Sequence, residues 1–328
     1  MTPTIPVLTL NNGRPFPILG CGTWKWKKCE QKRPFQHSVY MIIAAGYRLI
    51  DTAQKYGAEK EVGKGIRKAI KDGICKRGDI TVVTKLWVNN MTRERVIQSA
   101  KESNAKLGLG YIDVLLLHFP VPMRNLPGFP FPQNEDGTIA YDDSIDIYNE
   151  TWKAMEELVD AGITKSIGVS YFSSQQIEQL VRNARIKPVM NQVECSPLLP
   201  QEKLLATCKK HGIVLTAYSP FGESPPPLTF RKRSTRILTS KLFRSDIVRK
   251  LAAKYDKTVA QIVLKFHVAR GVAVIPMALT KELLEENMQI FDFELLPEEL
   301  NALKSMETGE RLVKVFGIEK SKYYPFTD

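Results

Sequence analysis

The sequence predicts an α/β protein with a (β/α)8 barrel, an N-terminal β-hairpin as a plug, and extra helices near the C-terminus. Short apolar, β-branched runs recur along the chain, an amphipathic stretch follows each of them, and eight such units are of similar size. Fully buried runs of this kind are typical of parallel strands that helices cover on the outside. A doubly wound sheet is the alternative, and eight near-equal units favour the closed barrel.

The expected elements follow in chain order. The opening stretch LTLNNGRPFPIL places Asn-Gly between two apolar runs, which predicts a hairpin that closes the N-terminal end of the barrel. The expected strands are residues 18–23, 48–51, 80–86, 112–118, 166–170, 188–194, 213–219 and 272–276. Helical spacing of apolar residues predicts helices at 36–45, 58–72, 92–107, 144–161, 173–184, 201–211, 245–255, 258–270, 281–288 and 297–306.

Two segments depart from this compact pattern. Residues 121–137 are rich in Pro and Gly, and residues 222–236 are Pro-rich and then basic. Both follow predicted strands, so they would emerge at the C-terminal face of a barrel, where barrel enzymes build their active sites.

Size and composition suit one such barrel. The 328 residues accommodate a barrel of about 250 residues with added loops, so we expect residues 1–328 to form a single domain. The chain is 43% hydrophobic and 25% charged, which is typical of a soluble protein with a large core. We find no apolar run near the length of a membrane span and no signal-peptide pattern at the N-terminus.

The five cysteines are scattered, and none forms a CxxC pair. This pattern argues against both a disulfide framework and a zinc site, and predicts reduced thiols in a cytoplasmic protein. The four histidines show no HxH or HExxH spacing, so a metal-dependent hydrolase is a weak alternative and we expect no metal.

The formal net charge of +12 raises the question of nucleic acid or an acidic ligand. Most basic residues alternate with acids on predicted helix faces, which indicates solvated surface. One denser cluster comprises Arg231, Lys232, Arg233, Arg236, Lys241 and Arg244. It is either an exposed basic loop or a loop that folds over a phosphate-bearing ligand, and we expect no nucleic-acid partner.

Ionisable residues stand at the ends of three consecutive predicted strands: Asp51, Lys85 and His118. A buried charge costs several kcal/mol unless it is paired, so Asp51 and Lys85 would compensate each other if both point inward. Because the C-terminal ends of barrel strands converge on one rim, the three side chains are expected to meet there.

Tyr56 follows Asp51 by one short turn and could reach the same pocket. A phenol is a poor acid at neutral pH, but an adjacent ammonium favours the phenolate, so we expect Lys85 to lower the pKa of Tyr56. Tyr56 would then act as a general acid toward a carbonyl oxygen that receives a hydride, and His118 would orient that oxygen. Each residue taken singly has an ordinary structural explanation; it is their grouping that favours function.

Blocks of sequence in a fixed order carry a resemblance to a known family. They are GYRLIDTAQKYGAEKEVGKGI, VTKLW, DVLLLHFP, GVSYFSSQQ, NQVECSP, AYSPFG and VIPMALTKELLEENMQIFDF. On these blocks the chain resembles the aldo-keto reductase family from about Leu8 to about Phe326. The resemblance implies a monomeric (β/α)8 carbonyl reductase that binds NADP(H) across the rim without a GxGxxG motif.

Carried over by position, the resemblance implies that Tyr56 is the general acid, Lys85 and Asp51 tune it, and His118 orients the carbonyl. It implies a larger set of cofactor contacts: Gly22, Thr23, Trp24, Asp51, Ser170, Tyr171, Gln192, Tyr218, Ser219, Phe221, Glu223, Ala278, Thr280, Lys281, Glu286 and Asn287.

Within this set, Tyr218 would stack on the nicotinamide while Gln192 and Ser170 bond its carboxamide, and Thr23 and Trp24 would line the other side. The other residues would contact the rest of the cofactor. Ser219, Phe221 and Glu223 would lie at the pyrophosphate, and Glu286 and Asn287 at the adenine.

Three positions depart from the family pattern. Tyr171 stands where the family usually has Asn beside the carboxamide. Met277 and Leu283 stand where it usually has the Lys and Arg that hold the 2′-phosphate of NADP. Lys281 or the Arg231 loop could replace them, so NADP(H) is expected, with NAD(H) or dual use as the alternative.

The predicted substrate pocket has apolar walls, formed by Trp24, Trp87, Phe119, Phe129 and Phe131, with His118 at its floor and the tail KYYPFTD along one side. This favours an apolar carbonyl, such as a lipid-derived aldehyde or a ketosteroid, as the small-molecule substrate. The alternative of another class is a regulatory protein that binds the cofactor without catalysis.

Overall fold

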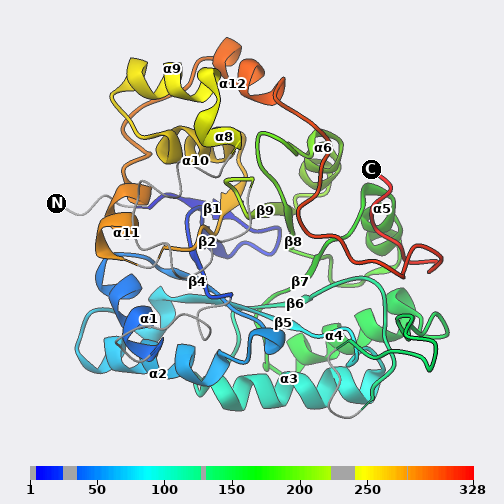
Figure 1. Ribbon diagram of the computed structural model, residues 1–328. Coiled ribbons are helices and arrows are strands. Elements are labelled where there is room, and N and C mark those ends of the chain that lie inside the picture. Colours follow the sequence, from blue (N-terminus) through cyan, green and yellow to red (C-terminus); the bar gives the residue numbers. More distant parts are fainter. Residues whose placement is uncertain (1–4, 25–34, 127–130, 223–240, 279) are drawn as a thin grey trace.

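The structure is a computed structural model that describes residues 5–24, 35–126, 131–222, 241–278 and 280–328. Eight strands form one sheet in the order β10-β9-β8-β7-β6-β5-β4-β3, and neighbours pair in parallel. A parallel bridge between Leu19 and Val274 links the two ends of the sheet. The predicted barrel is therefore confirmed, with helices arranged around the strands (Figure 1).

The strands all lie within the ranges that the sequence predicts. They are β3 (Cys21–Gly22), β4 (Leu49–Asp51), β5 (Thr81–Leu86), β6 (Val114–Leu117), β7 (Ile167–Ser170), β8 (Met190–Glu194), β9 (Val214–Tyr218) and β10 (Ala273–Val274).

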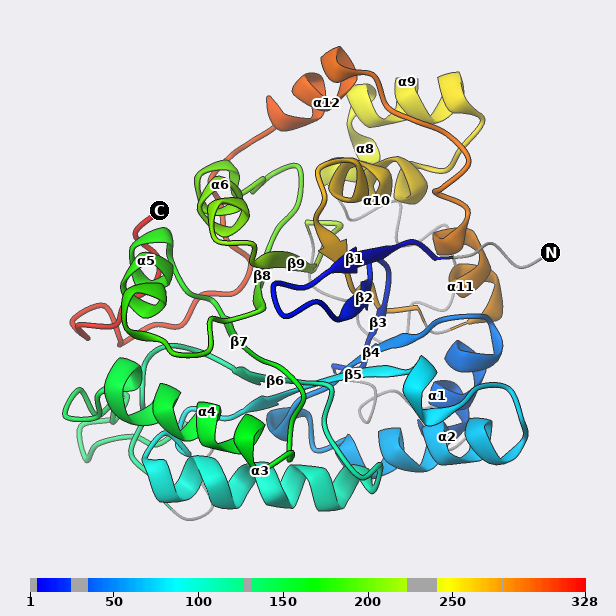
Figure 2. The same cartoon turned by 180° about the vertical axis from the view of Figure 1, so that it is seen from behind.

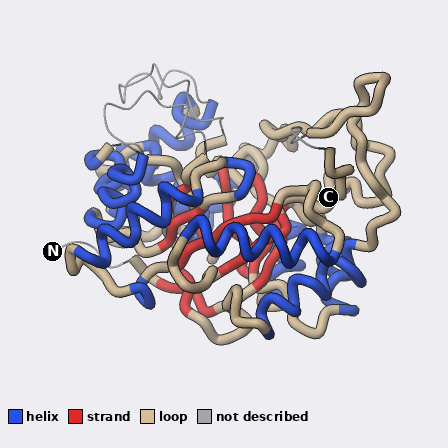
Figure 3. Tube along the Cα trace, turned by 90° about the horizontal axis from the view of Figure 1, so that it is seen from below, coloured by secondary structure: helices blue, strands red, loops and turns tan. Residues whose placement is uncertain are grey.

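The α-helices are α1 (Phe35–Ala44), α2 (Glu59–Lys71), α3 (Arg93–Leu107), α4 (Trp152–Asp160), α5 (Ser174–Asn183), α6 (Glu202–Lys210), α8 (Lys241–Arg244), α9 (Asp246–Tyr255), α10 (Val259–Ala269), α11 (Lys281–Met288) and α12 (Pro297–Lys304). Short 3-10 turns lie at η2 (Gln54–Tyr56) and η3 (Arg77–Asp79), and a π-helical turn at η4 (Ile147–Thr151). Figure 3 shows the helices outside the strands and long loops gathered at one end of the molecule.

Every second side chain of a strand points into the barrel, and these side chains fill its interior. Inward positions such as Leu49, Val83 and Leu116 form one apolar cluster inside the barrel, while their neighbours Ile50, Val82 and Leu115 belong to the cluster under the helices. Successive side chains of a strand point to opposite faces, so one run of apolar residues serves both layers. At Gly168 an added Cβ would come within 2.7 Å of Leu116, so the interior has no room for a side chain there.

The N-terminal hairpin closes one end of this interior. Strands β1 (Val7–Thr9) and β2 (Pro15–Pro17) pair antiparallel, as the Asn-Gly turn predicts. Leu10 and Phe16 are buried in the inner cluster with the strand residues. Figure 2 shows the hairpin across the middle of the barrel, so the opposite rim is left for the site.

Local signals explain where helices α5 and α10 begin and how helices α2 and α3 pack. Ser173 and Gln176 form a reciprocal capping box at the start of α5, and Thr258 and Gln261 form another at the start of α10. At Gly63 in α2 an added Cβ would collide with the backbone at the end of α3, so a glycine permits this close helix contact.

Two sequence expectations need correction. The helix predicted at 144–161 begins at Ile147 with the π-helical turn, because the Asp146 carboxylate accepts bonds from the backbone N–H groups of Tyr148 and Asn149. Lys241 and Arg244 lie in helix α8, not in a loop, and Lys241 forms an ion pair with Glu310 at 3.1 Å. The rest of the predicted basic cluster lies outside the described residues.

Three further observations hold for the described part of the chain. None of its helices has the length and apolar character needed to cross a membrane. No group of three or more His, Cys, Asp or Glu side chains is placed to hold a metal ion. Cys21, Cys75, Cys195 and Cys208 are free and buried.

Candidate active site

Polar residues end the inward rows of the strands at the rim opposite the hairpin. Leu49 is followed on the same face by Asp51, Val83 by Lys85, and Leu116 by His118. In the same way Ser170 and Tyr218 end the inward rows of β7 and β9, and Gln192 lies on the inward row of β8 at the level of Ser170. Because alternate residues of a strand face the barrel interior and the strand ends meet at one rim, these polar side chains form one surface there although they are far apart in the sequence.

Asp51 and Lys85 form a buried ion pair at the centre of this surface. Lys85 Nζ donates to Asp51 Oδ1 at 2.7 Å and Oδ2 at 2.8 Å, and their side chains are 2% exposed or less. Lys85 also donates to the carbonyl oxygen of Thr52 at 3.0 Å, and Gln192 Nε2 donates to Asp51 Oδ2 at 2.8 Å. Both charges thus have several polar partners, which a buried pair needs in order to be tolerated.

Tyr56 reaches this pair from the short turn η2. Lys85 Nζ lies 3.3 Å from Tyr56 Oη and 5.0 Å from the centre of its ring. The expected lowering of the Tyr56 pKa is nevertheless wrong: burial raises this pKa well above its usual value, and the negative charge of Asp51 adds to the increase. Asp51 offsets the charge of Lys85, so the phenol retains its proton at neutral pH.

His118 stands beside Tyr56, with ring centres 5.7 Å apart in an edge-on arrangement. Burial lowers the pKa of His118 well below its usual value, and the charges of Lys85 and Lys55 lower it further. The imidazole is therefore neutral at neutral pH, and its buried Nδ1 has no hydrogen-bond partner within the described structure. A neutral imidazole can donate one N–H to a ligand without introducing a charge.

Aromatic rings form two walls beside these groups. Trp87 lies 5.1 Å from the His118 ring and 5.1 Å from Phe131, which is 40% exposed. On the other side, Phe119 packs 4.9 Å from Tyr171 and 6.1 Å from Phe326 of the C-terminal segment. The predicted contribution of the tail to one side of the site therefore corresponds to Phe326.

Two carboxylates, the buried Glu194 and the half-buried Asp143, hold the C-terminal segment in place. Glu194, at the end of β8, accepts bonds from the backbone N–H groups of Leu312 and Val313. Asp143 accepts from Ser321 Oγ at 2.6 Å and from the backbone N–H of Lys322. These contacts join sequence positions more than a hundred residues apart, so sequence patterns gave no signal for them.

Residues expected at the nicotinamide also gather at the rim. Ser170 Oγ donates to the backbone oxygen of Gln192 at 2.7 Å, and Gln192 itself bonds Asp51. Tyr218 is partly exposed, with its ring 5.4 Å from that of Tyr171. Tyr171 has a φ of +64°, a left-handed conformation that is uncommon for a bulky residue and more common for Asn.

Thr23 and Trp24 follow β3 at the same rim. Thr23 is buried and donates through Oγ1 to the backbone oxygen of Asp51 at 2.8 Å. Trp24 is 39% exposed, whereas Gly22 is partly buried with the backbone oxygen of Ile275 close by. The structure thus places these three residues next to the Asp51 end of β4.

Residues expected along the rest of the cofactor extend from β9 to α11. Ser219 is partly exposed, whereas Phe221 is buried 5.5 Å from Phe243, so only its backbone remains for the predicted pyrophosphate contact. Ala278 is buried, and Thr280 caps α11 by accepting a bond from the N–H of Leu283.

At α11 the predicted adenine residues differ in environment. Glu286 Oε1 accepts from Thr258 Oγ1 at 2.6 Å, and Asn287 is buried. Lys281 is largely exposed, with its Nζ 3.5 Å from Glu285. Met277 and Leu283 are partly buried and pack against the core, so they offer no charge to a phosphate.

Some expectations lie outside the described residues: Glu223, Phe129 and the basic residues Arg231, Lys232, Arg233 and Arg236. Two residues that the sequence did not single out border the site. Gln54 joins the Tyr56 turn to the segment after β5, and Lys55 extends its ammonium over Trp87. The only signal for either is its position next to Tyr56 in the segment TAQKYG.

Comparison with known proteins agrees with this arrangement. A sequence profile of the aldo/keto reductase family matches residues 18–308. NAD(P)H-dependent D-xylose reductase I,II of Candida tropicalis is 37% identical over 316 residues, which span 94% of this chain and 95% of the relative. Prostaglandin F synthase 1 of Bos taurus is 36% identical over 334 residues, which span 100% of this chain and 99% of the relative.

Solved structures give the same result. The Bombyx mori aldo-keto reductase AKR2E4 in complex with NADP superposes with a TM-score of 0.83 at 36% identity, covering 98% of this chain and 99% of that one. The aldose reductase of Schistosoma japonicum superposes with a TM-score of 0.84 at 33% identity, covering 100% and 99%. The profile match and the full-length similarity show that this chain belongs to the aldo/keto reductase family.

Proposed function

We propose that this protein reduces an aldehyde or ketone to the alcohol with a nicotinamide cofactor, NADP(H) first, and that Tyr56 is its general acid. The observation that carries the proposal is the hydrogen-bonded chain from Tyr56 Oη through Lys85 Nζ to Asp51, beside a neutral His118. When bound, the reduced cofactor would supply a hydride to the carbonyl carbon.

The proton would come from Tyr56. Because the pKa of Tyr56 is raised, the hydroxyl is fully protonated at neutral pH and can donate to the carbonyl oxygen. As the proton leaves, the phenolate is stabilised by the Lys85 ammonium at 3.3 Å. Asp51 keeps that ammonium in place, and His118 would donate a second hydrogen bond that orients the same oxygen.

The donor set at the rim suits a nicotinamide cofactor. Ser170 and Gln192 offer a hydroxyl and an amide to a carboxamide, and Tyr218 offers a partly exposed ring for stacking. At the other end, the neutral Met277 and Leu283 weaken the case for a tightly held 2′-phosphate. NADPH is therefore proposed as the first cofactor, with use of NADH as well, in line with the name of the Candida tropicalis relative.

The substrate is proposed to have an apolar body. Trp87, Phe119, Phe131 and Phe326 present rings on two sides of His118, and Leu126 and Leu312 are exposed. A lipid-derived aldehyde or a ketosteroid fits such walls better than a sugar does. Relatives are named for sugar reduction and for prostaglandin synthesis, so these names leave the substrate class open.

The sequence also suggests a location, an oligomeric state and a domain organisation for this protein. We propose a cytoplasmic, monomeric protein whose 328 residues form one barrel domain, acting on a small molecule without nucleic acid. A salt-independent, flat response of retention on immobilised DNA would agree with this, because binding through phosphate contacts weakens steeply as salt is added.

The test is the initial rate of cofactor oxidation with 4-nitrobenzaldehyde, run with NADPH and NADH in parallel. We expect turnover with both and faster turnover with NADPH. Binding of either cofactor is followed separately by quenching of tryptophan fluorescence. Tight cofactor binding without turnover on a panel of aromatic, aliphatic and sugar aldehydes would replace the proposal with the regulatory alternative.

A further inference from the structure

Lys55 places a cation at the edge of the active site. Its Nζ lies 4.1 Å from the centre of the Phe131 ring and 4.8 Å from that of Trp87. Trp87 in turn packs edge-on against His118 at 5.1 Å, so a single ring separates the Lys55 ammonium from the group expected to orient the carbonyl. The charge of Lys55 is close enough to contribute to the lowered pKa of His118.

No carboxylate of the described structure balances this charge. Lys85 forms an ion pair with Asp51, and Lys281 with Glu285, but Lys55 forms none with any described residue. Burial alone lowers the pKa of Lys55, with no acid opposing the shift. The ammonium is therefore partly desolvated, and among the residues that the structure describes it contacts the faces of two aromatic rings, which leaves its hydrogen-bond donors available to a ligand.

The turn that carries Lys55 is fixed from both sides. Gln54 Nε2 donates to the backbone oxygen of Ser99 and to Ser103 Oγ, each at 3.0 Å. Gln54 Oε1 accepts from the backbone N–H of Trp87 at 2.9 Å. The same side chain thus sets the distance between the Lys55 turn and the Trp87 segment, so the ammonium is presented from a supported turn.

We propose that Lys55 binds a carboxylate on the substrate, so that the preferred substrates are carbonyl compounds that combine an apolar or aromatic body with a carboxylate. This inference rests on the proposed reductase function and specifies its substrate class. The body would lie against the aromatic walls, the carbonyl would reach Tyr56 and His118, and the carboxylate would meet the Lys55 ammonium.

A carboxylate fits this position better than a phosphate does. One ammonium between two rings can meet one carboxylate, whereas phosphate sites usually combine several N–H donors or cations. A second described cation near the site, Arg311, lies 4.8 Å from the Phe326 ring on the opposite wall. Burial raises the pKa of the Glu194 carboxyl, and the charge of Arg311 opposes this increase, so Arg311 already has an acidic neighbour, whereas Lys55 has none among the described residues.

The test compares 4-carboxybenzaldehyde with its methyl ester, methyl 4-formylbenzoate, as substrates for NADPH-dependent reduction. The two probes differ in one charge, and the ratio of their kcat/KM values cancels general effects on turnover. The ratio is measured for the wild type, Lys55→Met and Lys55→Arg. Lys60→Met is the matched control, because Lys60 is an exposed lysine of α2 whose removal changes the net charge equally.

We expect the wild type to prefer the acid and Lys55→Met to lower the acid-to-ester ratio by about tenfold or more, as for a lost hydrogen bond to a charged group. Lys55→Arg should retain most of the preference, and Lys60→Met all of it. In the wild type, added salt should reduce kcat/KM for the acid more than for the ester.

An acid-to-ester ratio that is equal in the wild type and in Lys55→Met, with both enzymes active on the ester, would overturn the inference and leave the reductase function intact. Absence of NADPH oxidation with either probe and with 4-nitrobenzaldehyde would instead count against the proposed function. If glyceraldehyde 3-phosphate showed a larger dependence on Lys55 than the carboxylate probe, the assignment to a carboxylate would be wrong.

Discussion

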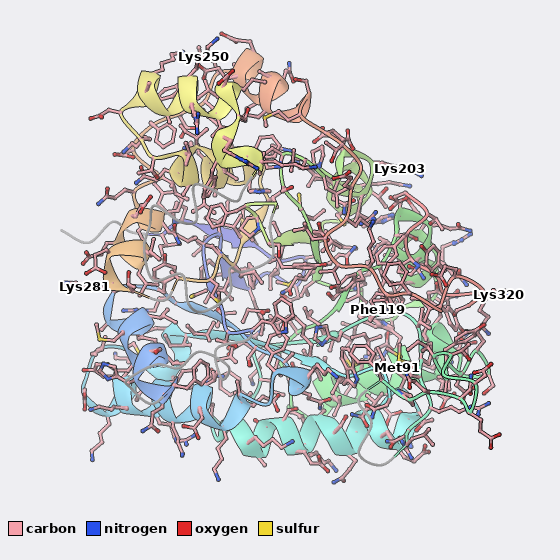
Figure 4. All side chains as sticks on the ribbon, viewed as in Figure 1. Met91, Phe119, Lys203, Lys250, Lys281 and Lys320 are labelled. Carbon is pink, nitrogen blue, oxygen red and sulfur yellow. The ribbon has the colours of Figure 1, made fainter. Side chains whose placement is uncertain are left out.

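The two ends of the expected cofactor site are built differently. At the catalytic end, Asp51, Lys85 and Gln192 form a buried, fully bonded cluster beside Tyr56. At the other end, beside α11, Met277 is neutral and the one described lysine of the segment, Lys281, is exposed and paired with Glu285. Figure 4 shows Lys281 at the outer edge of the molecule and Phe119 nearer its middle.

This difference indicates that one group of residues, at the strand ends, determines the reaction, whereas another group, beside α11, determines the choice of cofactor. The proposed catalytic groups Asp51, Lys85 and His118 sit at or next to strand ends, where the barrel holds their positions and the protein supplies their partners. The expected phosphate contacts would depend on a loop and the first turn of a helix, where side chains can change without disturbing the barrel. We therefore expect most substitutions at the strand-end site to abolish the reaction. One or two substitutions beside α11 should be enough to change the preference between NADPH and NADH.

The largest expected effect is at the buried ion pair. Lys85→Met leaves the Asp51 carboxylate buried without its cation, so we expect turnover to fall by about 10²-fold or more and the free energy of unfolding by about 3–5 kcal/mol. Chemical denaturation and steady-state rates measure the two losses. Lys265→Met is the matched control: Lys265 is also buried and pairs with Glu294, so its loss should reduce stability and leave turnover unchanged.

The next effect sharpens the comparison at the phosphate end. The double variant Met277→Lys, Leu283→Arg supplies two cations, each able to make a charge-assisted bond of about 1.5–3 kcal/mol to a 2′-phosphate. We expect the ratio of kcat/KM for NADPH over NADH to rise about tenfold or more. Val7→Lys, on the exposed hairpin strand β1, adds a charge at the other end of the barrel and should leave the ratio unchanged.

An unaltered cofactor ratio in the double variant would show that the 2′-phosphate does not lie at this segment.

A smaller change is expected from Tyr171→Asn. Asn adopts the left-handed backbone at this position more readily than Tyr and offers an amide to the carboxamide. We expect the Kd for NADPH to fall about two- to tenfold, as for one net hydrogen bond, while the KM for a bulky apolar aldehyde rises because contacts with Phe119 and Phe326 are lost. Fluorescence titration and rates measure these changes, and weaker NADPH binding would contradict the account.

The smallest expected effect is that of pH. The Tyr56 pKa is raised, so Tyr56 stays protonated as pH increases through 8, and the His118 pKa is lowered, so His118 stays neutral as pH decreases toward 6. The kcat/KM for an uncharged aldehyde should then vary by less than about twofold between pH 6 and 8. A clear titration in that range would show that one of the two pKa directions is wrong for the working enzyme.

Much of the fold and the core of the site could be predicted from sequence because both depend on local periodicity. The alternation that buries Leu49 also aims Asp51 inward, and the same holds for Val83 and Lys85. Once a barrel is inferred, convergence of the strand ends follows, and so does the pairing of two opposite charges.

The rest depends on distances that no local pattern encodes. The direction of the Tyr56 pKa depends on burial and on the nearby charge of Asp51, which both raise it, and the extent of each requires coordinates. The half-buried cation of Lys55 between two rings requires Phe131, which is distant in sequence, to fold back over the turn. The attachment of the C-terminal segment to Glu194 is likewise a long-range contact.

The central claim is that Tyr56 donates the proton at a strand-end site that otherwise only binds and orients. Its most direct test is the turnover of Tyr56→Phe with NADPH and 4-nitrobenzaldehyde, with NADPH binding followed by fluorescence. The account predicts a loss of turnover of about 10²–10⁴-fold with the Kd for NADPH changed by less than about threefold. A variant that binds NADPH normally and turns over within about fivefold of the wild type would contradict it.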